Sequence, residues 1–148
     1  MAKIRITKQF RFEMAHALKG HDGQCKFIHG HSYELFVTLI GIPRVEVGSP
    51  DNGMLVDFGQ LKKLVREAII DQFDHALVLS SDYEPAQLKQ FPELFDKTIF
   101  VDFQPTCENL LLDFVNRIKD ILPSSVALCS MKLQETITAY AEWFASDN

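Results

Sequence analysis

The sequence predicts an α+β fold, a four-stranded antiparallel sheet with two helices on one face, in the order ββααββ. Two observations lead to this prediction. Apolar and polar residues alternate with a two-residue period near both ends of the chain, and apolar residues recur at helical spacing in two segments between them. The 148 residues show no repeat and no linker. Residues 1–148 are therefore expected to form a single domain.

The first two strands are predicted at residues 3–16 and 32–42. The apolar positions that alternate along them are Ile4, Ile6, Phe10, Phe12 and Met14 in the first strand, and Tyr33, Leu35, Val37 and Leu39 in the second. His16 continues the first series and therefore falls on the same face as Met14. Residues 43–53 are polar and indicate an irregular connection or a short hairpin.

Two helices follow. Asp57 and Gln60 have the spacing of a capping box before an amphipathic helix over residues 58–73. Residues 74–105 are rich in loop signals, although residues 98–103 have the composition of a short strand. Thr106 is the expected cap of the second helix. The apolar side of this helix comprises Leu110, Leu111, Phe114, Val115 and Ile118.

The last two strands are expected at residues 125–136 and 139–145, with a tight turn between them. A sheet of this size has two edges that must be covered, charged or paired. Oligomerisation through the sheet edges is therefore a physical expectation.

Composition and charge exclude several classes of protein. The net charge is −5 and the pI is about 5.5, without a run of basic residues, which disfavours a nucleic-acid-binding surface. The N-terminal residues lack the apolar segment of a signal peptide, and no apolar run reaches the length of a membrane span. We therefore expect a cytoplasmic protein, in which Cys25, Cys107 and Cys129 are free thiols.

Three of the five histidines are predicted to converge. His29 and His31 point to the same side of the second strand, and a hairpin brings His16 level with them. Three imidazoles with one open position are the coordination pattern of a catalytic zinc site. A His-x-His pair alone is more often coincidental, so the third histidine carries the hypothesis. His21 lies in a polar loop and is expected to be solvated.

Cys25 stands four residues before His29, and the spacing leaves three interpretations open. In the first, the thiol is a fourth ligand that closes the metal site. In the second, it is a nearby base with a lowered pKa, and in the third it is a buried and inert side chain.

Six segments then occur in the order found in a known family. They are His16, CKFIHGH at 25–31, GMLVDFGQLK at 53–62, FDH at 73–75, PTCEN at 105–109 and LQET at 133–136. Together they resemble the 6-pyruvoyl-tetrahydropterin synthase and 6-carboxy-tetrahydropterin synthase family. The resemblance extends from about Phe10 to Tyr140, nearly the whole chain.

The resemblance implies the tunnelling fold, in which subunits join four-stranded sheets into a barrel, commonly as a hexamer of two trimers with active sites at subunit interfaces. It implies that Zn²⁺ is bound by His16, His29 and His31. It also implies a catalytic set of Cys25 as the base, Asp74 and His75 as a proton relay from a neighbouring subunit, and Glu135 as the anchor of the pterin. Thr106 and Glu108 would line the same pocket.

The substrate implied by the resemblance is 7,8-dihydroneopterin triphosphate. Candidate cations for the triphosphate are Lys19, Lys26 and Arg11.

Three residues separate Cys25 from His29, as in bacterial members that form 6-carboxy-tetrahydropterin, whereas animal-type pyruvoyl enzymes usually have a longer gap. The spacing therefore favours the carboxy-forming reaction of 7-deazapurine (queuosine) pathways. The alternatives are 6-pyruvoyl-tetrahydropterin synthesis, an aldolase or salvage reaction on another pterin, and a non-catalytic pterin-binding scaffold. The connections at 43–53 and 80–104 look longer than in compact bacterial members.

Overall fold

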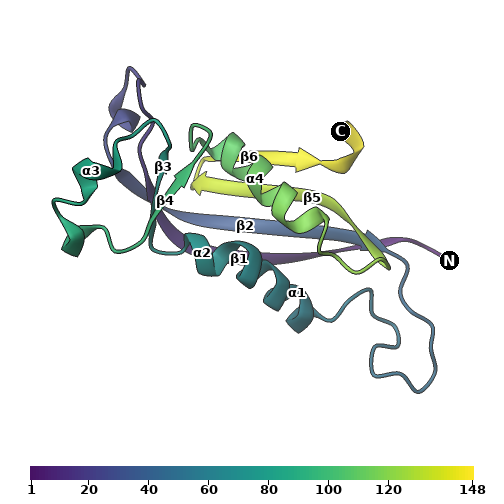
Figure 1. Ribbon diagram of the computed structural model, residues 1–148. Helices are drawn as coiled ribbons and strands as arrows, with labels where there is room; N and C mark the ends of the chain where they lie inside the picture. The colour runs from purple at the N-terminus through teal and green to yellow at the C-terminus, as the bar shows by residue number, and fades with distance from the viewer.

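The sheet of the computed structural model contains six strands, in the order β4-β3-β1-β2-β5-β6 (Figure 1). The structure describes residues 1–148, except for the side chain of Gln87. The strands are β1 (Ile4–His16), β2 (His29–Gly41), β3 (Ala76–Ser80), β4 (Thr98–Val101), β5 (Val126–Thr136) and β6 (Ala139–Phe144). The four long strands form the antiparallel meander β1-β2-β5-β6, as the alternation predicts.

The prediction of a four-stranded, purely antiparallel sheet is wrong in strand number and in direction. β3 pairs in parallel with β1 and with β4. All five residues of β3, ALVLS, are buried, so the strand lacks the two-residue period that marks a half-exposed strand. Strands in parallel pairs are commonly covered on both faces and read as continuous apolar runs. β4 corresponds to the short strand expected at 98–103.

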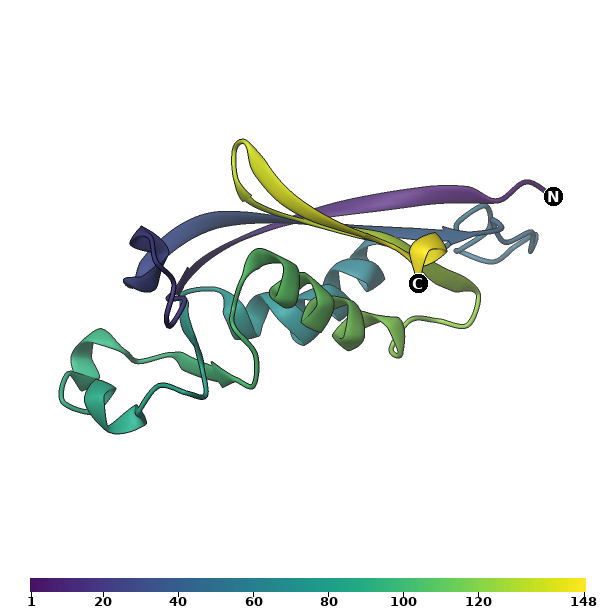
Figure 2. The same ribbon diagram turned by 90° about the horizontal axis from the view of Figure 1, so that it is seen from above.

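Two helical segments cover one face of the sheet (Figure 2). The first runs through α1 (Phe58–Val65), a π-helical segment (Arg66–Ile70) and α2 (Asp71–Phe73), which together match the predicted helix over 58–73. Asp57 caps it by accepting hydrogen bonds from the backbone N–H groups of Gly59 and Gln60. The second is α4 (Cys107–Lys119), which begins after Thr106 as predicted. A short helix, α3 (Pro85–Leu88), and 3₁₀ turns complete the chain.

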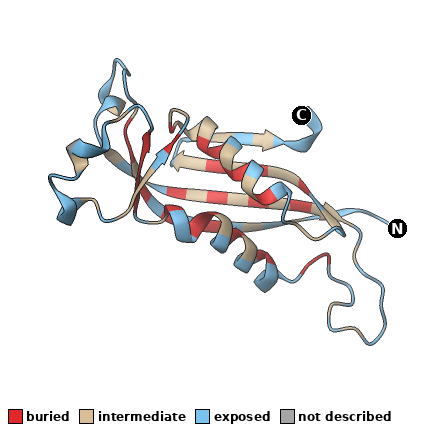
Figure 3. Ribbon diagram, viewed as in Figure 1, coloured by how far each residue is buried: buried red, intermediate tan, exposed pale blue. Residues whose placement is uncertain are grey.

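The hydrophobic core lies between this face of the sheet and the two helical segments. Buried residues alternate along β1 and β2, and they form a stripe on the sheet-facing side of each helix (Figure 3). Phe114 of α4 packs edge-to-face against Phe73, with ring centroids 4.9 Å apart. Burying each of these rings stabilises the fold by about 2–3 kcal/mol. Because the even positions of β1 face this core, His16 at the end of the strand points to the helix side.

The two long connections lie at opposite ends of the sheet (Figure 1). Residues 43–53 form a loop far from the junction of β1 and β2, whereas α3 and its flanking turns lie beside that junction. The turn with Cys25 (Gln24–Lys26) joins β1 to β2 at this second end. Among the described residues, no helix is long and apolar enough to cross a membrane.

Candidate metal centre

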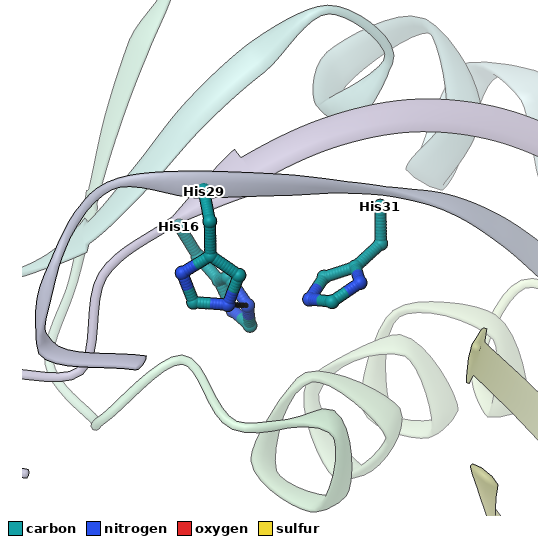
Figure 4. Close-up of side chains that lie close together, drawn as sticks. All are labelled: His16, His29 and His31. Atoms are coloured by element: carbon teal, nitrogen blue, oxygen red, sulfur yellow. Dashed lines mark hydrogen bonds between the residues drawn. The ribbon is translucent and has the colours of Figure 1, made fainter. Parts of the chain in front are cut away.

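Three histidines converge at the junction of β1 and β2. In the antiparallel register His16 pairs with His29 and Met14 pairs with His31, so all three imidazoles leave the sheet on the helix side. One nitrogen atom from each ring lies within 4.8 Å of one from each of the others (Figure 4). The ring centroids are 4.6–5.2 Å apart. The convergence predicted from the sequence is confirmed.

Hydrogen bonds orient two of these rings. His16 Nδ1 donates to the carbonyl oxygen of Pro105 at 2.7 Å, and His29 Nδ1 donates to that of Phe27 at 2.8 Å, because a carbonyl can only accept. Each Nε2 atom then presents a lone pair to the centre, which is the arrangement found at metal-binding histidines.

The residues fit a bound cation. The Nε2 atoms of His16 and His29 lie 3.1 Å apart, within hydrogen-bond distance (Figure 4). When both rings carry their proton on Nδ1, the two Nε2 lone pairs at this separation repel unless a shared proton or a metal ion lies between them. His31 Nε2 is buried and has no hydrogen-bond partner among the described side chains. Burial lowers the pKa values of His16 and His31, which favours the neutral imidazole that binds a metal.

Glu135 of β5 lies beside the three histidines. Its Oε1 atom lies 3.7 Å from His16 Nε2 and 3.8 Å from His31 Nε2, and the side chain is 24% exposed. The Tyr33 hydroxyl donates to the same oxygen at 3.0 Å. The alternation of the second strand predicts Tyr33 only as a core residue. Its place beside the histidines could have been found from the sequence, because His29, His31 and Tyr33 occupy successive positions on one face of β2.

The start of α4 lies beside the same carboxylate. Thr106 Oγ1 accepts a hydrogen bond from Asn109 N–H at 3.3 Å, and Glu108 is exposed. Cys107 donates through Sγ to the carbonyl oxygen of Leu133. Burial, and then the negative charge of Glu135, raise the pKa of the Cys107 thiol to about 12. The sequence does not predict that Cys107 lies beside Glu135, because the two residues come from segments that are distant along the chain.

Cys25 is half-buried and is outside the group of side chains that could share a metal ion among the described residues. The carbonyl oxygen of Cys25 accepts a hydrogen bond from Leu18 N–H at 2.9 Å, which ties the turn to the end of β1. Cys25 is a free thiol, as are Cys107 and Cys129, as predicted.

Asp74 and His75 form a dyad after α2. His75 Nδ1 lies 3.1 Å from Asp74 Oδ1, and the His75 side chain is 77% exposed. Burial alone would raise the pKa of Asp74, but hydrogen bonds from Glu13 N–H and His75 lower it below its ordinary value. His75 has a φ of 60°, in the left-handed region. A second bond, from His75 N–H to the Glu13 carbonyl oxygen, anchors the dyad to β1.

A cavity of about 710 Å³ lies between the dyad and the β1–β2 junction. His31 and His75 both line it, together with Glu13, Ser32 and residues 93–97. The connection at 80–104 therefore contributes a wall of the cavity, whereas the loop at 43–53 lies at the other end of the sheet (Figure 1).

The three basic residues named for a triphosphate have other contacts. Arg11 pairs with Glu34 at 2.8 Å, and Lys19 Nζ donates to the carbonyl oxygen of Asp82. Lys26 lies over the ring of Phe27 and lines a smaller cavity of about 360 Å³.

The sequence of residues 5–145 matches the profile of the family described as 6-pyruvoyl tetrahydropterin synthase. The chain belongs to this family. It is 34% identical over 142 residues to the 6-carboxy-5,6,7,8-tetrahydropterin synthase of Haemophilus influenzae, a match that covers 95% of this chain and 98% of that protein. The protein of the same name from Rickettsia typhi is 30% identical over 141 residues, covering 94% and 99% of the two chains. The resemblance stated from the six segments is thereby confirmed.

Solved structures share the fold. An uncharacterized protein from Wolinella succinogenes, WS1659, superposes with a TM-score of 0.77 at 20% identity, over 98% of this chain and 99% of that one. The 6-pyruvoyl tetrahydropterin synthase of Caenorhabditis elegans superposes with a TM-score of 0.69 at 23% identity, over 98% and 97% of the two chains. The tunnelling-fold assignment therefore holds, with two short parallel strands added to the four long ones.

Proposed function

We propose that the protein is a zinc-dependent 6-carboxy-5,6,7,8-tetrahydropterin synthase. It converts 7,8-dihydroneopterin triphosphate and one water molecule into 6-carboxy-tetrahydropterin, acetaldehyde and triphosphate. The observation that carries the proposal is the convergence of three imidazole nitrogens beside a carboxylate, in a chain whose relatives bear that name.

His16, His29 and His31 hold the zinc ion in this proposal. Three protein ligands leave one position for substrate, as in catalytic rather than structural zinc sites. When bound, zinc supplies a Lewis acid that polarises the oxygens of the substrate side chain and acidifies the neighbouring C–H bond. The carbonyl groups of Pro105 and Phe27 keep two of the rings in the required tautomer.

Cys25 acts as the base that removes a proton from the substrate side chain. The proposal is supported by the position of its turn in the connection that joins His16 to His29, and by the absence of Cys25 from the group of possible metal ligands among the described residues. A thiolate can act as a general base that abstracts a proton. Cys25→Ala should abolish turnover and leave zinc bound, whereas a non-catalytic scaffold would keep pterin binding and have no turnover to lose.

Asp74 and His75 form the proton relay that returns a proton to the substrate. Asp74, with its lowered pKa, stays ionised and orients the imidazole through the 3.1 Å contact. The exposed side chain of His75 is suited to reach the centre of a neighbouring subunit. The proposed assembly is a hexamer of two stacked trimers, in which subunits join through the edges of their sheets.

Glu135 binds the pterin, whose amino group and ring N–H form two adjacent donors. A carboxylate accepts both donors, and its charge strengthens the pair. Thr106 and Glu108 line the same pocket from the start of α4. The Thr106 hydroxyl accepts from Asn109 N–H and therefore still has its own proton to donate to a ligand. This reaction uses a small-molecule substrate in the cytoplasm.

The second candidate is 6-pyruvoyl-tetrahydropterin synthesis from the same substrate, the name carried by the family profile and by the Caenorhabditis elegans structure. Incubation with 7,8-dihydroneopterin triphosphate, followed by mass spectrometry, separates the two. We expect acetaldehyde and 6-carboxy-tetrahydropterin. A pyruvoyl product would instead favour the second candidate, and a zinc-loaded protein that forms neither product would exclude both.

A further inference from the structure

The backbone of β5 does not by itself fix the carboxylate of Glu135. On one side, the β2–β5 ladder ends at the pair of Glu34 with Gln134. On the other, Gln134 pairs with Tyr140 and Thr136 pairs with Ala139, so Glu135 falls at an irregularity in the β5–β6 register. Such bulges redirect a side chain near active sites. A side-chain contact must then hold the carboxylate in place.

Tyr33 is a rigid support for this purpose. Its side chain is fully buried, and its ring stacks on Phe12 with centroids 5.2 Å apart and an interplanar angle of 11°. The neighbouring His31 ring packs edge-to-face with the Tyr33 ring, with centroids 5.5 Å apart. The hydroxyl therefore has one fixed position, from which it donates to Glu135 Oε1 at 3.0 Å. A phenol is protonated at neutral pH and can therefore donate this hydrogen bond.

We propose that Tyr33 is a positioning residue whose hydroxyl holds Glu135 Oε1 toward the metal centre and leaves both lone pairs of Glu135 Oε2 to accept hydrogen bonds from a ligand. All three polar contacts of the carboxylate, with Tyr33, His16 and His31, involve Oε1. Oε2 has no hydrogen bond or ion pair with the side chains that the structure describes. The inference rests on the proposed metal centre and deepens it.

The first test measures zinc affinity in a double-mutant cycle of Tyr33→Phe and Glu135→Gln. Glu135→Gln removes a negative charge close to two ligand nitrogens and should weaken zinc binding about tenfold. Tyr33→Phe keeps the ring but releases the carboxylate toward solvent, so it should weaken zinc binding by about threefold to tenfold, the loss expected for one hydrogen bond. The double variant should bind zinc no more weakly than Glu135→Gln alone, because Tyr33 acts through Glu135. Tyr140→Phe on β6, whose side chain is exposed, is the matched control and should bind zinc like the wild type.

Zinc affinity of Tyr33→Phe equal to that of the wild type would overturn the inference, as would additive effects of the two substitutions. Unchanged affinity in Glu135→Gln would also overturn it, because the carboxylate would then not face the metal centre. A purely structural role for the hydroxyl predicts a lower unfolding midpoint with unchanged zinc affinity.

A second readout uses turnover of 7,8-dihydroneopterin triphosphate. Tyr33→Phe should raise KM about tenfold, the loss expected when a hydrogen bond to a charged group disappears. It should cause no further rise in the Glu135→Gln background. If the wild type binds zinc but does not turn over this substrate, the proposed function fails while the zinc cycle still decides the role of Tyr33. If the wild type binds no zinc, both proposals fail.

Discussion

His75 offers a prediction that separates the contribution of its backbone conformation to stability from the contribution of its side chain to activity. Its φ of 60° places a non-glycine residue in the left-handed region. That conformation costs an L-residue about 1–2 kcal/mol, whereas glycine adopts it without this penalty. Glycine also makes the unfolded chain more flexible, which offsets about 0.5–1 kcal/mol of the gain. We therefore expect His75→Gly to be more stable than His75→Ala by about 0.5–1 kcal/mol.

Loss of the side chain itself should cost little stability. The imidazole is 77% exposed, and its contact with Asp74 is that of an exposed ion pair, worth about 0–1 kcal/mol. Both variants nevertheless lack the proposed relay and should lose about 100-fold to 10,000-fold in turnover. Strain kept at an active-site residue is a common way for function to limit stability.

The measurements are urea unfolding midpoints and initial rates for the wild type, His75→Ala and His75→Gly. The comparison of the two variants isolates the backbone term, because neither has the imidazole. If His75→Gly were no more stable than His75→Ala, the argument from backbone strain would be wrong. Wild-type turnover in either variant would remove His75 from the catalytic set.

Three further predictions concern the site. His29→Ala should lose bound zinc in metal analysis, whereas His21→Ala, in an exposed loop, should retain it; equal zinc contents would exclude His29 as a ligand. Coexpression of Cys25→Ala with His75→Ala should restore turnover at about a quarter of the sites if the two residues come from different subunits, and at none if one chain supplies both. Cys107, whose raised pKa of about 12 exceeds its ordinary 9.0, should resist iodoacetamide at pH 8 in the folded protein. Its neutral thiol stabilises the fold below pH 9, and this contribution is lost as the pH rises toward 12. Between these pH values, the unfolding midpoint of Cys107→Ala should therefore depend less on pH than that of the wild type.

The features that the sequence predicts well depend on local periodicity. Alternation along β1 and β2 places His16, His29 and His31 on one face of the sheet. Because the two strands form a hairpin, His16 at the end of β1 lies beside the other two at the start of β2. The helix over 58–73 and the cap at Thr106 follow from side-chain spacing and capping chemistry in the same local way. These parts of the fold need no knowledge of distant contacts.

The features that the sequence does not predict depend on contacts between distant segments. β3 is buried on both faces, so its apolar run has no period that separates it from a loop or a buried helix. The contact of Tyr33 with Glu135 joins residues 102 positions apart and exists only because β2 and β5 are neighbours. Similarly, the anchoring of the Asp74 dyad by Glu13 requires the parallel pairing of β1 with β3.

Zinc titration of the metal-free protein, with acetaldehyde release as the readout, tests the central claim most directly. The account predicts that the rate of acetaldehyde formation rises with added zinc and levels off at about one zinc ion per chain, because one group of three histidines lies in each chain. Full activity in the metal-free protein would contradict the claim, and so would zinc binding at that ratio without acetaldehyde release.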